Sequence, residues 1–139
     1  MSLPGIDPDA KILVVDDMDS IRTILVQILK DMGFSNIIEA ANGQEAMAKF
    51  LEETESLRNI DIIISDLNMP LMNGIELLKS VRTHFFGSDI PFLIVTTEQE
   101  KETVIECIQA GATNYIIKPF EQDVVRERII EAYQTLNLK

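Results

Sequence analysis

The feature that most constrains the fold is the stretch 62–70, which reads Ile-Ile-Ile-Ser-Asp-Leu-Asn-Met-Pro. Three consecutive β-branched apolar residues are typical of a strand buried on both faces, as at the centre of a parallel sheet. Pro70 and the turn-forming pair Asn73-Gly74 predict that a loop follows and leads into a helix. The chain therefore places one carboxylate, Asp66, at the carboxyl end of a core strand, where α/β sheets bind their ligands.

Four other segments have the composition of strands, and amphipathic helical patterns separate them. The remaining strands are predicted at 11–17, 35–40, 91–97 and 113–118. Helices are predicted wherever apolar residues recur at the i, i+3, i+4, i+7 spacing of one buried face, and Gly33 and Gly111 are the expected stops of two of them. The side chains expected on the buried faces are Ile21, Ile24, Leu25, Ile28, Leu29, Met32, Ala46, Met47, Phe50, Leu51, Leu77, Leu78, Val81, Phe85, Val125, Ile129, Ala132 and Leu136.

Five strands alternating with five helices specify an α/β fold with a parallel sheet and right-handed crossovers. The strands at 11–17, 62–70 and 91–97 are the most continuously apolar and are expected at the centre, with the other two at the edges. The flavodoxin-like, doubly wound order 2-1-3-4-5 satisfies both conditions. Residues 11–139 are expected to form this single domain, and residues 1–10, with two prolines and a glycine, are expected to be a flexible lead-in.

The charge and the cysteine content exclude several classes of protein. A net charge of −11 argues against nucleic acid and against an anionic membrane surface, because both are held by clustered Lys and Arg. No apolar run approaches the length of a membrane span. The single Cys107 cannot form an internal disulfide, and this fits a reducing cytoplasm.

Polar side chains gather at the carboxyl ends of the predicted strands: Asp16, Asp17, Asp66, Thr96 and Lys118. The predicted topology brings them to one edge of the sheet. Three carboxylates in one place repel, each close pair costing about 4 kcal/mol at an effective dielectric constant of about 20. A divalent cation relieves this repulsion, and oxygen ligands favour Mg²⁺ over a Zn²⁺ site built on Cys or His.

The remaining groups at this edge suit a phosphoryl group. The ammonium of Lys118 can pair with one phosphoryl oxygen, and the hydroxyl of Thr96 can bond another. A metal, a lysine and a hydroxyl around one protruding carboxylate are typical of phosphoryl transfer, which depends on positioning and charge neutralisation. Asp66 is then the candidate nucleophile.

Each of these residues also has a simpler interpretation when it is taken alone. Asp16 and Asp17 could be acids at a solvated helix start, and Asp66 could cap the following turn. Thr96 could be an ordinary strand residue, and Lys118 could lie on the surface. It is the combination of all five at one sheet edge that favours the site.

Four motifs in order and at matching spacing resemble the response-regulator receiver domain of two-component signalling. They are Val14-Val15-Asp16-Asp17, the run 66–74, Val95-Thr96 and Lys118-Pro119-Phe120. Within that family the chain looks most like the stand-alone chemotaxis regulators of the CheY type. Asn68, Glu98, Tyr115 and the segment 109–112 carry this closer resemblance.

The resemblance implies a role for each site residue. Asp66 would accept a phosphoryl group from a histidine kinase. Asp17 and Asp66, with the backbone carbonyl of Asn68, would ligate Mg²⁺, and Asp16 would act through a bound water. Lys118 would pair with the phosphoryl oxygens, and its bond to Pro119 is expected to be cis.

The resemblance also implies a switch and a set of partners. Thr96 would move toward the phosphoryl group and draw Tyr115 inward. The face formed by the fourth helix, the fifth strand and the fifth helix would then change its affinity, with Val104, Ile108 and Tyr115 as apolar contacts. The target would be a flagellar motor-switch protein or, alternatively, a phosphotransfer protein in a relay, and a phosphatase would be a further partner. The protein is expected to be a monomer and a signalling switch, not an enzyme, unless it is a receiver from a larger regulator.

Two other classes use related chemistry or a related fold. A phosphatase of the haloacid-dehalogenase type needs its nucleophile in an Asp-x-Asp pair after the first strand, whereas Asp66 follows the third and is followed by Asn68. A nucleotide- or flavin-binding domain needs a Gly-rich or Ser/Thr-rich loop after the first strand. Asp16, Asp17 and Asp19 would repel a phosphate at that position. Both alternatives therefore fit the residues less well.

Overall fold

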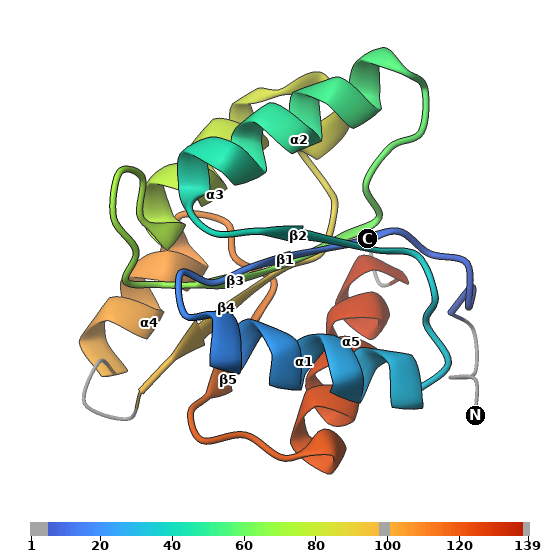
Figure 1. The fold of residues 1–139 in the computed structure, drawn as a ribbon. Coiled ribbons are helices and arrows are strands. Elements are labelled where there is room, and N and C mark those ends of the chain that lie inside the picture. The colour runs from blue at the N-terminus through green and yellow to red at the C-terminus, as the bar shows by residue number, and fades with distance from the viewer. Residues whose placement is uncertain (1–5, 98–100, 138–139) are drawn as a thin grey trace.

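The computed structural model describes residues 6–97 and 101–137, and the side chains of 135–137 are not described. Over these residues, strands and helices alternate along the chain (Figure 1). The strands are β1 (Ile12–Val15), β2 (Ile37–Ala40), β3 (Ile62–Asp66), β4 (Phe92–Thr96) and β5 (Asn114–Ile117). The helices are α1 (Asp19–Asp31), α2 (Gly43–Glu55), α3 (Gly74–Thr83), α4 (Lys101–Gln109) and α5 (Gln122–Asn137), with a short 3-10 helix, η1, at Phe85–Gly87.

The strands form one parallel sheet in the order β2-β1-β3-β4-β5. This confirms the predicted flavodoxin-like topology. Every residue of β1, β3 and β4 is buried, whereas β2 and β5 are partly accessible, as the predicted division into central and edge strands requires.

Two hydrophobic cores sandwich the sheet. Figure 1 shows α1 and α5 on one side of the sheet and α2 and α3 on the other, and Cys107 of α4 belongs to the same core as α2 and α3. Leu25 and Leu29 of α1 pack with Ile129 of α5 in the first core. Phe50 of α2 packs with Leu78 of α3 in the second core. Two buried layers hold the strands rigidly, so that the loops at their carboxyl ends are presented by a fixed frame.

Three side chains that the helical spacing assigned to the core are exposed. Ile24 is 49% exposed, because it lies five positions before the buried Leu29, about 140° away around α1. Leu51 is 37% exposed, because it follows the buried Phe50 by one residue and therefore points to a different side of α2. Phe85 is 84% exposed, because α3 ends at Thr83 and the helical spacing does not continue into η1.

Part of the segment 1–10, which was predicted to be a flexible lead-in, belongs to the folded domain. Ile6 and Ala10 are buried at 6% and 4% exposure, and both belong to the core beneath α1 and α5. The fold therefore begins before residue 11. Glu98 and the side chain of Leu136, which was expected to be buried, lie outside the described residues.

Glycines end two of the helices as predicted. Gly33 follows α1 with φ of 105°, and Gly111 follows α4 with φ of 114°. These left-handed conformations favour glycine over any residue with a Cβ. Among the described residues, no helix is both long and apolar enough to cross a membrane.

Candidate functional site

The sheet brings the predicted site residues to one edge. Four of them lie at or directly after the last residue of a strand: Asp16 after β1, Asp66 in β3, Thr96 in β4 and Lys118 after β5. The strand ends are aligned by the register pairs Val15–Ser65, Asp66–Val95 and Thr96–Ile117. Parallel strands in register end at the same edge, and this is why residues far apart in sequence meet here.

Three carboxylates form the centre of this edge. Asp16, Asp17 and Asp66 each offer one carboxylate oxygen, and these oxygens lie within 4.8 Å of one another. Asp16 and Asp66 are buried, at 2% and 6% exposure, whereas Asp17 is open to solvent. Close, partly desolvated carboxylates with an open side fit a hard divalent cation that binds oxygen and retains water, such as Mg²⁺.

Lys118 lies against this acid cluster. Its Nζ is 3.0 Å from Oδ1 of Asp66 and 3.6 Å from Oδ2 of Asp16. Burial acts to lower the pKa of the ammonium, but the hydrogen bond to Asp66 and the charges of both carboxylates raise the pKa above its ordinary value. Lys118 therefore stays positively charged and neutralises only part of the cluster.

The surroundings of Asp66 disfavour the ionised form of its carboxyl. Burial raises its pKa, the hydrogen bond from Lys118 opposes this, and the negative charge of Asp16 adds to the rise. The net pKa lies above the ordinary value for aspartate. A bound cation would stabilise the charged form of this carboxyl.

The loop after β3 approaches the backbone of Asp66 closely. Asn73 caps α3 through a capping box with Glu76, and the N–H of Gly74 donates to the carbonyl of Leu67 at 2.9 Å. A Cβ added to Gly74 would lie 2.6 Å from the carbonyl oxygen of Asp66. A glycine is required at this position because the start of α3 packs directly against the strand end that carries Asp66.

The turn after β1 is tied to α1 by a residue that sequence reasoning missed. Nη1 of Arg22 donates to the carbonyl of Asp16 at 2.7 Å, and the N–H of Met18 donates to Oδ1 of Asp16 at 2.9 Å. A backbone carbonyl leaves no mark in a sequence, and an arginine on the first turns of a helix looks like an ordinary solvated residue. No local signal pointed to Arg22.

Two of the other predicted residues, Thr96 and Asn68, lie at or near the same edge. Thr96 is buried at 2% exposure in the last position of β4, and Asn68 is exposed in the loop after β3. The peptide bond between Lys118 and Pro119 is cis, as predicted. Tyr115 lies apart from the acid cluster, in the middle of β5, and its ring packs under the guanidinium of Arg128 at 4.6 Å.

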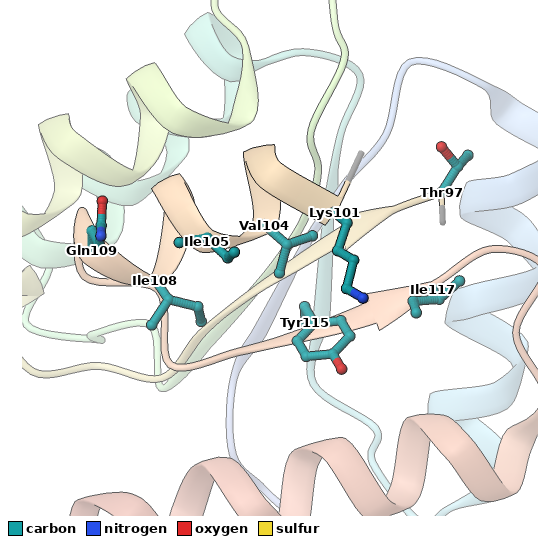
Figure 2. Close-up of a pocket in the computed structure, with 8 residues that line it drawn as sticks. All are labelled: Thr97, Lys101, Val104, Ile105, Ile108, Gln109, Tyr115 and Ile117. Carbon is teal, nitrogen blue, oxygen red and sulfur yellow. The ribbon is translucent and has the colours of Figure 1, made fainter. Parts of the chain in front are cut away.

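A pocket of about 720 Å³ opens beside the site, between α4 and β5 (Figure 2). Its lining consists of Thr97, Lys101, Val104, Ile105, Ile108, Gln109, Tyr115 and Ile117. Val104, Ile108 and Tyr115, the three predicted apolar contacts, all line it, and Ile108 is 44% exposed. Figure 2 shows the Tyr115 hydroxyl pointing away from Val104. An open, mainly apolar groove of this kind suits apolar side chains of another molecule.

Comparison with known proteins agrees with this geometry. Residues 12–130 match the family model of the response regulator receiver domain. The chain is 38% identical to the chemotaxis protein CheY of Pseudomonas aeruginosa over 127 residues, which cover 91% of this chain and 98% of that protein. It is 39% identical to the chemotaxis protein CheY1 of Helicobacter pylori over 119 residues, covering 86% and 93% of the two chains.

Solved structures show the same relationship. Vibrio cholerae CheY4 superposes with a TM-score of 0.80 at 37% identity, covering 89% of this chain and 98% of that one. CheY in a complex with CheX, BeF₃ and Mg²⁺ from Borrelia burgdorferi has a TM-score of 0.80 at 30% identity, and 89% of each chain is covered. The triad of Asp16, Asp17 and Asp66 is typical of the Mg²⁺ site of receivers. The chain therefore belongs to the response regulator receiver domain family and is a signalling switch rather than an enzyme.

Proposed function

We propose that this protein is a chemotaxis response regulator that accepts a phosphoryl group on Asp66 from a histidine kinase. The observation that carries the proposal is the buried carboxylate of Asp66, which lies within 4.8 Å of two further carboxylates and 3.0 Å from the Lys118 ammonium. This arrangement supplies an oxygen nucleophile, a place for a cation and a fixed positive charge at one edge of the sheet.

Each residue has a defined part in the transfer. A carboxylate oxygen of Asp66 attacks the phosphorus of a phosphohistidine, and the P–N bond breaks with its electron pair returning to the imidazole, which takes a proton from solvent. Asp17, Asp66 and the backbone carbonyl of Asn68 would hold Mg²⁺, with Asp16 acting through a water. The ion, when bound, neutralises charge on the phosphoryl oxygens. Lys118 moves its hydrogen bond from the free carboxylate to a phosphoryl oxygen.

The carboxyl ends of β4 and β5 connect the candidate site to the pocket between α4 and β5. Thr97 and Ile117, which line the pocket, are the sequence neighbours of Thr96 and Lys118. We propose that Thr96 turns its hydroxyl to a phosphoryl oxygen, and that this shift frees space into which Tyr115 turns from its place against Arg128. The charge change at Asp66 thereby alters the shape of the pocket and its affinity for a partner.

The partner side of the proposal follows from the relatives and from the pocket. Two relatives with 38% and 39% identity are chemotaxis proteins, so a flagellar motor-switch protein is the proposed target. Its apolar side chains would enter the pocket between α4 and β5. A further partner would be a phosphatase that removes the phosphoryl group, and we propose that the protein acts as a monomer in the cytoplasm.

Labelling with a phosphohistidine donor or with acetyl phosphate tests the phosphoacceptor. Wild type should incorporate phosphate in a Mg²⁺-dependent reaction, and Asp66→Ala should not. Asp123→Asn, which changes an exposed acid on α5, is the matched control and should label normally. Undiminished labelling of Asp66→Ala would place the acceptor elsewhere.

A binding experiment tests the partner. Purified flagellar motor-switch protein and a purified phosphotransfer protein are each offered to the regulator with and without beryllofluoride and Mg²⁺. The proposal expects the motor-switch protein to bind more tightly to the beryllofluoride form. Binding of the phosphotransfer protein alone would assign the chain to a phosphorelay.

A further inference from the structure

Arg22 joins three elements around the acid cluster without entering it. Its Nη1 donates to the carbonyl oxygen of Asp16 at 2.7 Å, its Nη2 to Oδ1 of Asp19 at 2.6 Å, and its Nε to Oε1 of Glu39 at 3.0 Å. These acceptors belong to the turn after β1, to the start of α1 and to β2. Although Arg22 lies on the first turns of a helix, its side chain is only 16% exposed.

The carbonyl that Arg22 holds belongs to the peptide between two of the clustered acids. A peptide group is planar, so fixing the carbonyl of Asp16 also fixes the orientation of the bond that leads into Asp17. Asp17 is the exposed member of the triad, and neighbouring side chains do not enclose it as they enclose Asp16 and Asp66. Its carboxylate can therefore be aimed at the cluster chiefly through the backbone.

The start of α1 needs such a tether. The N-cap residue Met18 makes no side-chain cap hydrogen bond, whereas α2 and α3 are both capped by asparagine. The turn of only three residues, 16–18, between β1 and α1 is thus held by Arg22 from the helix side, with Glu39 anchoring the guanidinium to the neighbouring strand.

The charge of Arg22 is directed away from the acid cluster. Burial acts to lower its pKa, but the hydrogen bonds to Asp19 and Glu39 raise the pKa above the ordinary arginine value. Within residues 6–97 and 101–137, its ion pairs are with these two outer carboxylates, and its contact toward the cluster is with a neutral carbonyl. Arg22 therefore leaves the negative charge of the cluster available to a cation, in contrast to Lys118.

We propose that Arg22 is a positioning residue that sets the aim of Asp17 and thereby the affinity of the acid cluster for Mg²⁺. The inference rests on the proposed function of that cluster. The planar fork of the guanidinium is essential, because the three acceptors are bound by three separate nitrogens, Nε, Nη1 and Nη2, and the single nitrogen of a lysine ammonium cannot reach all of them. Residues that orient metal ligands from outside typically change metal affinity by about 10- to 100-fold when they are replaced.

Calorimetric titration with Mg²⁺ tests the inference. Arg22→Lys keeps the charge and should weaken Mg²⁺ binding about tenfold, while the labelling rate at saturating Mg²⁺ stays within about twofold of wild type. Arg82→Lys is the matched control, because Arg82 also donates to backbone carbonyls, those of Gly87 and Gly111, but lies away from the cluster. It should leave Mg²⁺ affinity unchanged. Circular dichroism checks that each variant is folded.

A second variant keeps the test decisive if Arg22→Lys does not fold. Glu39→Gln removes the charge that anchors the guanidinium to β2 and should weaken Mg²⁺ binding about threefold, in the same direction but less than Arg22→Lys. Unchanged Mg²⁺ affinity in a folded Arg22→Lys, or in Glu39→Gln when that variant alone is folded, overturns the inference. Slow labelling of Arg22→Lys even at saturating Mg²⁺ overturns it too, because the defect would then lie beyond metal affinity. Failure of wild type to bind Mg²⁺ would instead overturn the proposed function.

Discussion

The Nζ of Lys118 lies 3.0 Å from Oδ1 of Asp66, close enough for a charge-assisted hydrogen bond. The same ammonium is 3.6 Å from Oδ2 of Asp16, so it lies between the two buried carboxylates. From this position it can also reach a phosphoryl group on Asp66. Phosphorylation would therefore exchange one acceptor of Lys118 for another with little movement of the side chain. The exchange depends on the compact, rotatable ammonium.

Lys118→Arg should separate metal binding from switching. The planar guanidinium keeps the charge but cannot take the position of the ammonium between Asp16 and Asp66, so phosphoryl recognition should be lost. Mg²⁺ affinity should change by less than about threefold, because the three carboxylates remain. The measurement is the change in amide chemical shift at Tyr115 and Ile108 on adding beryllofluoride with Mg²⁺. Wild-type-like shifts in the variant would contradict this role.

Mg²⁺ should stabilise the folded protein through the acid cluster. A ligand that binds only the folded state adds about 2.7 kcal/mol at a concentration 100 times its dissociation constant. Asp17→Asn should remove most of this gain and, without Mg²⁺, should be at least as stable as wild type because one repulsion is relieved. Thermal unfolding of both proteins with and without Mg²⁺ measures the effect. An equal rise in Tm for the two proteins would show that Asp17 is not a ligand.

The candidate site could be predicted because most of its residues lie at places that the strand pattern alone specifies. Asp16, Asp66 and Lys118 each end an apolar run, and the alternation of strands and helices determines which ends meet. The site could therefore be predicted from the topology alone, without knowledge of how the side chains pack. The roles of Thr96 and Tyr115 in switching concern a second conformation and remain predictions.

The parts that could not be predicted depend on packing across the chain. Ile24 fits the helical spacing of α1 yet is exposed, because the direction of the buried face is set by the sheet and α5. Ile6 joins the core although its neighbours are typical of a linker. Arg22 acts on a backbone carbonyl and on Glu39 of another strand, and neither contact has a sequence signature.

Gly74→Ala should disturb the strand end that carries Asp66. The added Cβ would lie 2.6 Å from the carbonyl oxygen of Asp66 and 3.0 Å from Cα of Leu67, and both atoms belong to the backbone. We expect a loss of about 1–3 kcal/mol in the free energy of unfolding, together with weaker Mg²⁺ binding. Urea denaturation and calorimetry measure the two effects. Lys79→Ala, at an exposed position of the same helix, is the control and should change stability by less than about 0.5 kcal/mol.

Ile108→Ser should weaken partner binding without affecting phosphorylation. Ile108 is 44% exposed in the lining of the pocket between α4 and β5, so its replacement costs the fold little. A central apolar contact contributes about 1–2 kcal/mol to binding, which corresponds to about tenfold in affinity. The comparison is binding of the beryllofluoride form to the motor-switch protein. Ile24→Ser, at an equally exposed apolar position on α1, is the control, and an equal loss in both variants would argue against the pocket.

Tyr133 should make the protein sensitive to alkaline pH. Burial, with the nearby charges of Asp61 and Asp7, raises the pKa of its hydroxyl to about 12, from an ordinary value of 10.0. Because the folded state holds the proton more tightly than the unfolded chain, the stabilisation is complete below about pH 10 and is lost as the pH rises toward 12. We expect the loss to be about 1 kcal/mol, discounted for the partial exposure of the ring.

Urea unfolding of wild type and Tyr133→Phe at pH 8 and pH 11 measures this loss. The stability of wild type relative to Tyr133→Phe should be lower at pH 11 than at pH 8, because only wild type carries the ionising group. The titration itself can be followed by tyrosinate absorbance in a Tyr115→Phe background, where Tyr133 is the sole tyrosine of the chain. An absorbance midpoint near 10 would show that the ring is not shielded by its burial and its acidic neighbours.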